Sequence, residues 1–407
     1  MTSTSPLPRS SRPRTLLLYA HYNTRASYYD DWLDAFRIAP QFETSELNIC
    51  DRNAAAFLRK QILDVDLLIL LHSVNADHVF YLEPLTSILA DRRCALVSFV
   101  GNEVNLPAAP ISEKRRVLKT IRPDVIATQL LLEAGEYLWG DIASVLALPH
   151  ALNSSAFAIR TAPETRKLDL GVRSFRYPAV LGDRDRNLVM DWVSGWGAAH
   201  QLTVEVSSRR LARGDWADYL DSCRGTVSTE AGSWYLQRDD SLMRQVVEHY
   251  GGETRRPVLS SKNVTLRKIA HRLPWRLREL LVSLVSRGPI KYEATALLHV
   301  SEQEILEKFF SKADRTPTYG KCVSSRHFDA IGTGTVQILL TGRYNDILVP
   351  STHYLELARD FSNADELARQ FLDQGERRRI AETALEHAKA NHTYAHRVAA
   401  LASRIGA

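Results

Sequence analysis

Residues 324–335 read SSRHFDAIGTGT, and the apolar run VQILL follows at once at residues 336–340. The hydroxyls of Ser324 and Ser325 suit the start of a short helix, which the glycines end before a buried strand begins. The free N–H groups of such a helix start and the forked guanidinium of Arg326 favour an anion, and Asp329 lies one turn further on. On local spacing alone, an ordinary serine-capped helix and strand is the preferred interpretation.

The first part of the chain alternates apolar strand candidates with helix-like stretches. This alternation predicts an α/β fold in which a parallel sheet is covered on both faces. The expected strands are residues 15–19, 64–71, 95–100, 125–127 and 144–148. The expected helices are residues 28–38, 79–90 and 130–139.

A polar, proline-containing linker at residues 151–167 precedes a second α/β series, so we expect two domains. The tail at residues 1–14 is expected to be disordered, and the two domains are expected at residues 15–150 and 168–392. Ser362 and Asp365 are expected to cap a helix at residues 366–373. The other expected elements are strands at residues 168–172, 202–206, 226–228 and 336–340, and helices at residues 186–195, 377–390 and 394–405.

Composition indicates a globular protein. The 407 residues are 45% hydrophobic and 24% charged, with a formal net charge of +5. This modest charge, without a basic aromatic recognition motif, gives no reason to expect a nucleic acid partner. No segment approaches the roughly 20 apolar residues that span a bilayer, and residues 1–14 lack the apolar region of a secretory signal. The four cysteines (Cys50, Cys94, Cys223 and Cys322) are isolated, as reduced thiols are, so we expect a cytoplasmic protein.

Residues 328–338 resemble the donor-site segment of nucleotide-sugar-dependent glycosyltransferases with the GT-B fold. Other segments resemble one bacterial branch of this family, similar to the group 1 glycosyltransferases, that assembles surface carbohydrate. They are residues 99–103, 148–153, 169–173, 229–233 and 342–363. The likeness covers most of the chain and is weakest at residues 241–317. It implies two Rossmann-like domains facing across a cleft, with a last helix at residues 393–407 that packs back on the first domain.

The resemblance implies a transferase of hexosyl type. Such an enzyme moves a sugar from a nucleotide-sugar donor to a glycan or lipid-linked acceptor in surface polysaccharide biosynthesis. Two other classes remain open, namely an inactive protein of this fold that binds a nucleotide or glycan, and a nucleotide-sugar epimerase. The sequence contains no nucleophile elbow, P-loop or dinucleotide fingerprint, which argues against the commonest hydrolases, ATPases and dehydrogenases of this fold class.

The expected donor site lies in the second domain. In the family an acidic residue on a short helix holds the ribose, a role that falls to Asp329. The helix start at Ser324 and Ser325 and the cation of Arg326 match a diphosphate. Many relatives carry a second acidic residue upstream, where this chain has Lys321, which in this interpretation serves the phosphate instead.

Two further residues follow predicted strands of the second domain. Arg173 follows the strand at residues 168–172, and the resemblance implies that it contacts the diphosphate. Glu230 follows the strand at residues 226–228, in a loop of the kind that lines a cleft. For each of them, a solvated loop charge or a local ion pair explains the sequence equally well.

Activation of an acceptor hydroxyl requires a base, and the first domain offers three candidates at the carboxyl ends of predicted strands. They are Glu103, His21 and His72. We favour Glu103, because Gly101 and Asn102 predict a tight turn that holds its carboxylate at the rim. His21 is the second choice. A structural role is the alternative for each.

Residues 266–287 form a basic amphipathic stretch of the kind that lies on an anionic membrane surface. Pro274 interrupts this stretch, and a solvated basic face is the alternative. Peripheral contact with the inner face of the membrane is therefore an expectation for this segment. No Asp-x-Asp motif is identified as one of the kind that binds a divalent ion beneath a diphosphate, and no His/Cys cluster at zinc spacing is found, so no metal and no other cofactor is predicted beside the nucleotide sugar.

Overall fold

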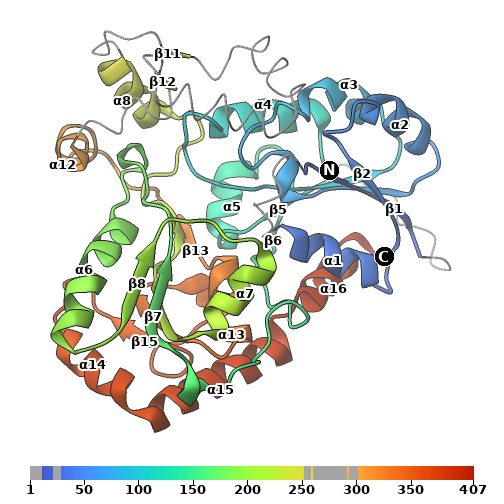
Figure 1. Cartoon of the computed structure of the whole chain (residues 1–407). Coiled ribbons are helices and arrows are strands. Elements are labelled where there is room, and N and C mark those ends of the chain that lie inside the picture. The colour runs from blue at the N-terminus through green and yellow to red at the C-terminus, as the bar shows by residue number, and fades with distance from the viewer. Residues whose placement is uncertain (1–11, 22–28, 252–257, 260–290, 293–300) are drawn as a thin grey trace.

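The computed structural model of the chain describes residues 12–21, 29–251, 258–259, 291–292 and 301–407 (Figure 1). Two parallel sheets with interleaved helices make up most of this part of the chain. The predicted α/β class, with two Rossmann-like units, is therefore confirmed. The basic stretch at residues 266–287 lies outside the described residues.

The first sheet has six parallel strands in the order β2-β1-β3-β4-β5-β6. Its strands are β1 (Arg14–Tyr19), β2 (Glu43–Asn48), β3 (Leu67–Leu70), β4 (Ala95–Phe99), β5 (Val125–Thr128) and β6 (Ser144–Ala147). The helices of this part are α1 (Asp30–Ile38), α2 (Ala54–Gln61), α3 (Thr86–Ala90), α4 (Ile111–Ile121) and α5 (Leu132–Trp139).

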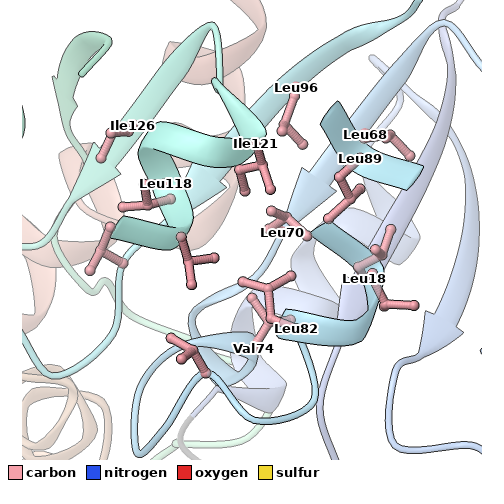
Figure 2. Close-up of a cluster of buried hydrophobic side chains, with 14 of the residues drawn as sticks. Leu18, Leu68, Leu70, Val74, Leu82, Leu89, Leu96, Leu118, Ile121 and Ile126 are labelled. Carbon is pink, nitrogen blue, oxygen red and sulfur yellow. The ribbon is translucent and has the colours of Figure 1, made fainter. Parts of the chain in front are cut away.

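Successive residues of these strands alternate between two hydrophobic cores, because neighbouring side chains of a strand point to opposite faces. Leu16 and Leu18 belong to the core under α2–α5, which Figure 2 shows, with Leu118 and Ile121 of α4 packed against strand side chains. Leu17 instead faces the core on the opposite side, under α1. Truncating a fully buried leucine such as Leu118 to alanine is expected to cost about 2–5 kcal/mol.

The second sheet has five parallel strands in the order β15-β14-β9-β7-β8. Its strands are β7 (Leu168–Arg173), β8 (Val204–Ser207), β9 (Cys223–Ser228), β14 (Val336–Leu340) and β15 (Leu355–Leu357). The helices of this part are α6 (Asp185–Ala199), α7 (Arg213–Asp221), α13 (Ser325–Gly332), α14 (Ala364–Leu372) and α15 (Gln374–Asn391). Ile338 faces the core with α6 and α14, and Leu339 faces the core with α13 and α15.

Between β9 and α13 the chain leaves the second sheet and reaches the first domain. Asp240 accepts hydrogen bonds from the backbone N–H groups of Ile111 (3.0 Å) and Ser112 (2.8 Å), and so caps the start of α4. This part of the chain contains β10 (Ala231–Gly232), α8 (Ser241–Gly251), β11 (Val258–Leu259), β12 (Lys291–Tyr292), α12 (Glu302–Ile305) continued by a π-helical turn (Leu306–Phe310), and β13 (Lys321–Cys322).

The last helix, α16 (Tyr394–Ile405), lies on the first domain and not on the second. Its buried side chains Tyr394, Val398 and Leu401 share a core with Trp32 and Phe36 of α1. Figure 1 shows α16 beside α1, after α15 has run along the second domain. The crossing of the C-terminal chain therefore ties the two sheets together.

Several elements differ from the expectations. The sequence patterns did not predict the edge strands β2 and β15, or helices α2, α4 and α7. Strand β2 reads ETSELN and is only partly buried, so it lacks the apolar run of an inner strand. The capping expected from Ser362 and Asp365 is wrong. Helix α14 begins after Asn363, and the hydroxyl of Ser362 donates to Asp360 (2.7 Å).

Candidate functional site

A cavity of about 480 Å³ lies between the two domains. Its walls are loops that follow the parallel strands β4, β5, β7 and β8, together with the start of α13. Ligands of open α/β sheets bind at this edge, beyond the carboxyl ends of the strands. The volume lies in the range of small-molecule sites. The cavity is therefore the candidate functional site.

The start of α13 forms one wall, with Ser324, Ser325, Arg326 and Asp329 all lining the cavity. Ser324 is the N-cap residue, and its backbone N–H donates to Nδ1 of His327 (2.9 Å). Burial lowers the pKa of His327 to about 3, so the imidazole is neutral and accepts this bond. The short helix expected from SSRHFDAIGTGT is thus confirmed, with a histidine as part of its cap.

Two arginines meet beside this helix start. Nη1 of Arg326 donates to the hydroxyl of Ser174 (3.0 Å), in the loop after β7. Arg173, the last residue of β7, forms an ion pair with Glu205 and stacks on the ring of Tyr219, 4.2 Å from the ring centre. The structure therefore brings Arg173, Arg326, Ser324 and Ser325 to one wall of one cavity.

Asp329 lines the same wall and is almost fully buried. Its carboxylate accepts a hydrogen bond from Nε1 of Trp216 in α7 (2.9 Å). Burial, and then the nearby carboxylate of Asp31, raise the pKa of Asp329 well above its ordinary range. A carboxyl group can accept a hydrogen bond from a ribose hydroxyl, and in its protonated form it can also donate one.

Lys321 and Glu230 do not line the cavity, so the structure does not bring these two expected donor contacts together with Arg326 and Asp329. Lys321 is buried and pairs with Asp183 (2.7 Å) and Asp185 (2.5 Å), so two carboxylates already neutralise its charge. Glu230 is buried as well, and it accepts hydrogen bonds from the backbone N–H of Tyr344 (2.7 Å) and the hydroxyl of Tyr319. Both side chains hold the second domain together.

The position expected for Glu103 at the rim is also wrong. Its carboxylate is buried and accepts hydrogen bonds from the hydroxyl of Thr128 (2.7 Å), Nε1 of Trp139 (2.7 Å) and the backbone N–H of Gln129 (2.8 Å). The predicted tight turn exists, because Asn102 has a φ of 46°. It is Asn102, however, that lines the cavity.

The two histidine candidates of the first domain are not among the lining residues either. His21 is exposed at the end of β1, and its backbone N–H donates to Oδ1 of Asn48 (3.0 Å). His72 is fully buried in a stack of rings with Tyr29 (5.1 Å between centres) and His150 (5.6 Å). Burial lowers the pKa of His72 well below its ordinary value, so this residue is a neutral part of the core.

Sequence reasoning missed most of the basic side chains at the site. Besides Arg173 and Arg326, five more arginines line the cavity. They are Arg176, Arg186, Arg209, Arg210 and Arg213. The signal was present, because residues 173–176 (RSFR) and 207–213 (SSRRLAR) directly follow β7 and β8. A strongly positive wall of this kind attracts anionic ligands.

The first domain contributes a different chemistry. Its lining side chains are mostly neutral or acidic: Tyr29, Asp31, Asp77, Asn102, Gln129 and His150. Nδ2 of Asn102 donates to Asp77 (2.8 Å), and Nδ1 of His150 lies 3.1 Å from the hydroxyl of Tyr394. Carboxylates, amides and hydroxyls of this kind are hydrogen-bonding partners for a molecule rich in hydroxyl groups.

Asp31 is the functional candidate of the first domain that the sequence patterns did not reveal. It lies in the first turn of α1 and lines the cavity. Oδ1 accepts hydrogen bonds from Asn153 (2.6 Å) and Arg213 (2.9 Å). Burial raises the pKa of Asp31 to about 6, although the hydrogen bonds from Asn153 and Arg213 act to lower it. A carboxylate with this pKa is suited to proton transfer near neutral pH.

In the described part of the chain, no group of three or more His, Cys, Asp or Glu side chains is arranged to hold a metal ion. Among the same residues, no helix has the length and apolar character needed to cross a membrane.

Residues 283–403 match a protein family described as glycosyl transferase-like. This part of the chain is glycosyltransferase-like. It contains α13 and β14, and hence Arg326 and Asp329 of the cavity wall. The resemblance drawn from residues 328–338 is thereby confirmed. No curated protein matches the sequence at a significant level.

Several solved structures with low sequence identity to this chain have a similar backbone path. The chain is similar to the Anabaena protein HepE (Alr3699), solved in complex with UDP-glucose, with 9% identity and a TM-score of 0.47, covering 97% of this chain and 99% of that one. A glycosyltransferase from Rickettsia africae gives 9% identity and a TM-score of 0.44, covering 97% and 98%. A UDP-forming trehalose-phosphate synthase from Burkholderia xenovorans gives 14% identity and a TM-score of 0.38, covering 93% of this chain and 85% of that one. These values are too low to support an argument about substrates.

Proposed function

We propose that the protein transfers a sugar from a nucleotide-sugar donor to a hydroxyl-bearing acceptor, as a glycosyltransferase of the GT-B fold. The observation that supports this proposal is the division of charge across the cavity. Seven arginines and a helix start line the wall of the second domain, whereas neutral and acidic hydrogen-bonding groups line the wall of the first. A nucleotide sugar and a polyhydroxyl acceptor have these two complementary chemistries.

In this proposal the diphosphate lies at the start of α13. The free backbone N–H groups there and the guanidinium of Arg326 compensate its charge. Arg186 contributes from the first turn of α6, since it lines the same cavity as the start of α13. Asp329 hydrogen-bonds the ribose. Stabilising the charge of the departing diphosphate is then the main catalytic contribution of the second domain.

The acceptor hydroxyl lies on the side of the first domain. Its oxygen forms a bond to the anomeric carbon of the sugar, while the bond from that carbon to the diphosphate oxygen breaks and the nucleoside diphosphate leaves. The hydroxyl proton passes to a base, and Asp31 takes this role in the proposal, because it lines the cavity and has a pKa of about 6. Neither Glu103 nor His21 lines the cavity, so we do not assign the role to them.

Finer assignments rest on the resemblance alone. A hexosyl donor, a glycan or lipid-linked acceptor, a place in surface polysaccharide biosynthesis and a cytoplasmic location with membrane contact through residues 266–287 are parts of this proposal. A flotation assay with anionic vesicles tests the membrane contact, and binding that is absent at low salt would contradict it.

Product analysis after incubation with UDP-glucose, GDP-mannose, ADP-glucose or CMP-sialic acid, with and without acceptor glycans, tests the activity. We expect release of the nucleotide, accelerated by an acceptor, and loss of this release in Arg326→Ala. Arg369→Ala removes an exposed arginine of α14 and is the control. Nucleotide binding without release would favour an inactive binding protein, and a changed donor sugar without an acceptor would favour an epimerase.

A further inference from the structure

The seven arginines of the cavity differ in the partners that they already have. Arg173 pairs with Glu205, Arg176 pairs with Asp191, and Arg213 pairs with Asp31 and Asp34. Within the described part of the chain, no carboxylate lies within ion-pair distance of Arg186, Arg209 or Arg210. The protein thus presents unneutralised guanidinium groups to a space that a ligand can enter.

Three of the arginines are stacked on aromatic rings. The guanidinium carbon lies 4.2 Å from the ring centre of Tyr219 for Arg173, 3.7 Å from that of Tyr177 for Arg186, and 4.9 Å from that of Phe175 for Arg210. Stacking occupies the face of the guanidinium plane, whereas the N–H donors lie in the plane and remain available for a phosphate or carboxylate. The stacks therefore hold the guanidinium groups of Arg186 and Arg210 ready to bind an anion, whereas Glu205 already occupies that of Arg173.

The proposed donor site accounts for only some of this charge. Arg326, Arg186 and the start of α13 are sufficient partners for a diphosphate. Arg209 and Arg210 lie on a different segment, the loop between β8 and α7, and both are exposed. Two adjacent cations without a counter-charge repel each other weakly in water, and an anion that binds to both removes this repulsion.

The position of this loop relates it to the site of transfer. It leads directly into α7, whose first residue, Arg213, reaches Asp31 of the first domain. Arg210 rests on Phe175, which belongs to the loop after β7 that also contributes Ser174 to the contact with Arg326. The loop thus connects to the segment beside the proposed diphosphate contact and to the residue that reaches the first domain, where in the proposed function the transferred sugar and the acceptor meet.

We propose that Arg209 and Arg210 bind a second anionic group, a carboxylate or phosphate, on the transferred sugar or on the acceptor. The substrate pair of this protein therefore carries negative charge beyond the diphosphate of the donor. This inference rests on the proposed function and specifies its substrate class.

Calorimetric titration of the full-length protein tests the inference. The probes are UDP, UDP-glucose and UDP-glucuronic acid, and then inorganic phosphate added to the UDP complex. The variant is Arg209→Gln with Arg210→Gln. The control, Arg59→Gln with Lys60→Gln, removes the same charge from the exposed face of α2 in the first domain.

We expect the double variant to bind UDP and UDP-glucose as the wild type does. It should lose tenfold or more in affinity for UDP-glucuronic acid if the anion is on the donor sugar. It should lose as much affinity for inorganic phosphate, added to the UDP complex, if the anionic group is on the acceptor. Equal losses for UDP itself would assign both arginines to the diphosphate and overturn the inference.

Unchanged affinity of the double variant for both anionic probes would also overturn the inference, while leaving the proposed function intact. No binding of any nucleotide by the wild type, with GDP, ADP and CMP titrated beside UDP, would instead remove the proposed function and the inference together.

Discussion

Arg213 of the second domain joins Asp31 of the first domain at the edge of the cavity. One guanidinium nitrogen, Nη1, lies 2.9 Å from Oδ1 of Asp31 and 2.6 Å from Oδ2 of Asp34. Asp31 is 2% exposed, whereas Arg213 is 31% exposed on its side chain. The contact therefore sets the approach of α7 to α1, and with it the width of the cavity between them.

Loss of this contact should destabilise the protein. Arg213→Ala leaves the buried carboxylate of Asp31 with Asn153 as its side-chain hydrogen-bond donor within the described part of the chain, and we expect a loss of about 1–3 kcal/mol in the free energy of unfolding. Urea denaturation measures it. Arg378→Ala breaks an exposed pair with Glu382 and should cost less than about 0.5 kcal/mol. Equal losses in both variants would show that the contact between the domains adds nothing.

Asp31 should make the stability depend on pH. Burial raises its pKa from an ordinary 3.8 to about 6, so between these values the folded protein binds more protons than the unfolded chain. The stability of the wild type relative to Asp31→Asn is then greatest below about pH 4 and falls, by about 3 kcal/mol in total, as the pH rises through about 6. Denaturant titrations from pH 3.5 to 8 measure this difference. A difference that is constant with pH would contradict the raised pKa.

Glu103 should be a structural residue and not the base. In Glu103→Gln, an N–H₂ group replaces one of two oxygens that accept hydrogen bonds from Thr128, Trp139 and the backbone of Gln129. Two donors then face each other, and we expect a loss of about 1–3 kcal/mol in stability. The rate of transfer per folded molecule should stay close to that of the wild type. A stable variant without turnover would restore the catalytic interpretation.

The inner strands and the last helix could be predicted from the sequence. Residues 336–340 and 394–405 were expected as a strand and a helix, and these are the bounds of β14 and α16. Both have strong apolar patterns, because packing buries every residue of β14 and one face of α16. The polar edge strand β2 has a weaker pattern, since it is only partly buried. Helix α4 has an apolar face that includes Ile111, Leu118 and Ile121, but it also buries Lys114 and Arg115, which a sequence pattern assigns to the surface.

The candidate site was predicted on one side only. The start of α13 is a local motif, and Ser324, Ser325, Arg326 and Asp329 were assigned to a donor site because residues 328–338 resemble a family segment; local spacing alone favoured an ordinary capped helix. The direction of the Glu103 side chain could not be predicted in this way. At the turn, the side chain of Asn102 faces the cavity, and that of Glu103 faces the core. The loop arginines, likewise, converge only after β7 and β8 pair side by side in the sheet.

Asp329 should determine the preference for ribose. In the wild type we expect a ribonucleoside diphosphate to bind about tenfold more tightly than its 2′-deoxy analogue, since the analogue lacks a hydroxyl for a buried carboxyl group. Asp329→Ala should bind both alike. Calorimetric titration of the two ligands to each protein measures the preference. A wild type that does not discriminate between them would place the ribose elsewhere.

The central claim is that the start of α13 and Arg326 bind the diphosphate of a nucleotide donor. The most direct measurement is the thermal shift of the wild type and Arg326→Ala with UDP, GDP, ADP and CMP. At about a hundred times its dissociation constant, the preferred nucleotide should stabilise the wild type by about 2.7 kcal/mol. Arg326→Ala should melt near the temperature of the free wild type and bind this nucleotide about ten- to a hundredfold more weakly. No shift with any nucleotide, or an equal shift in both proteins, would contradict the account.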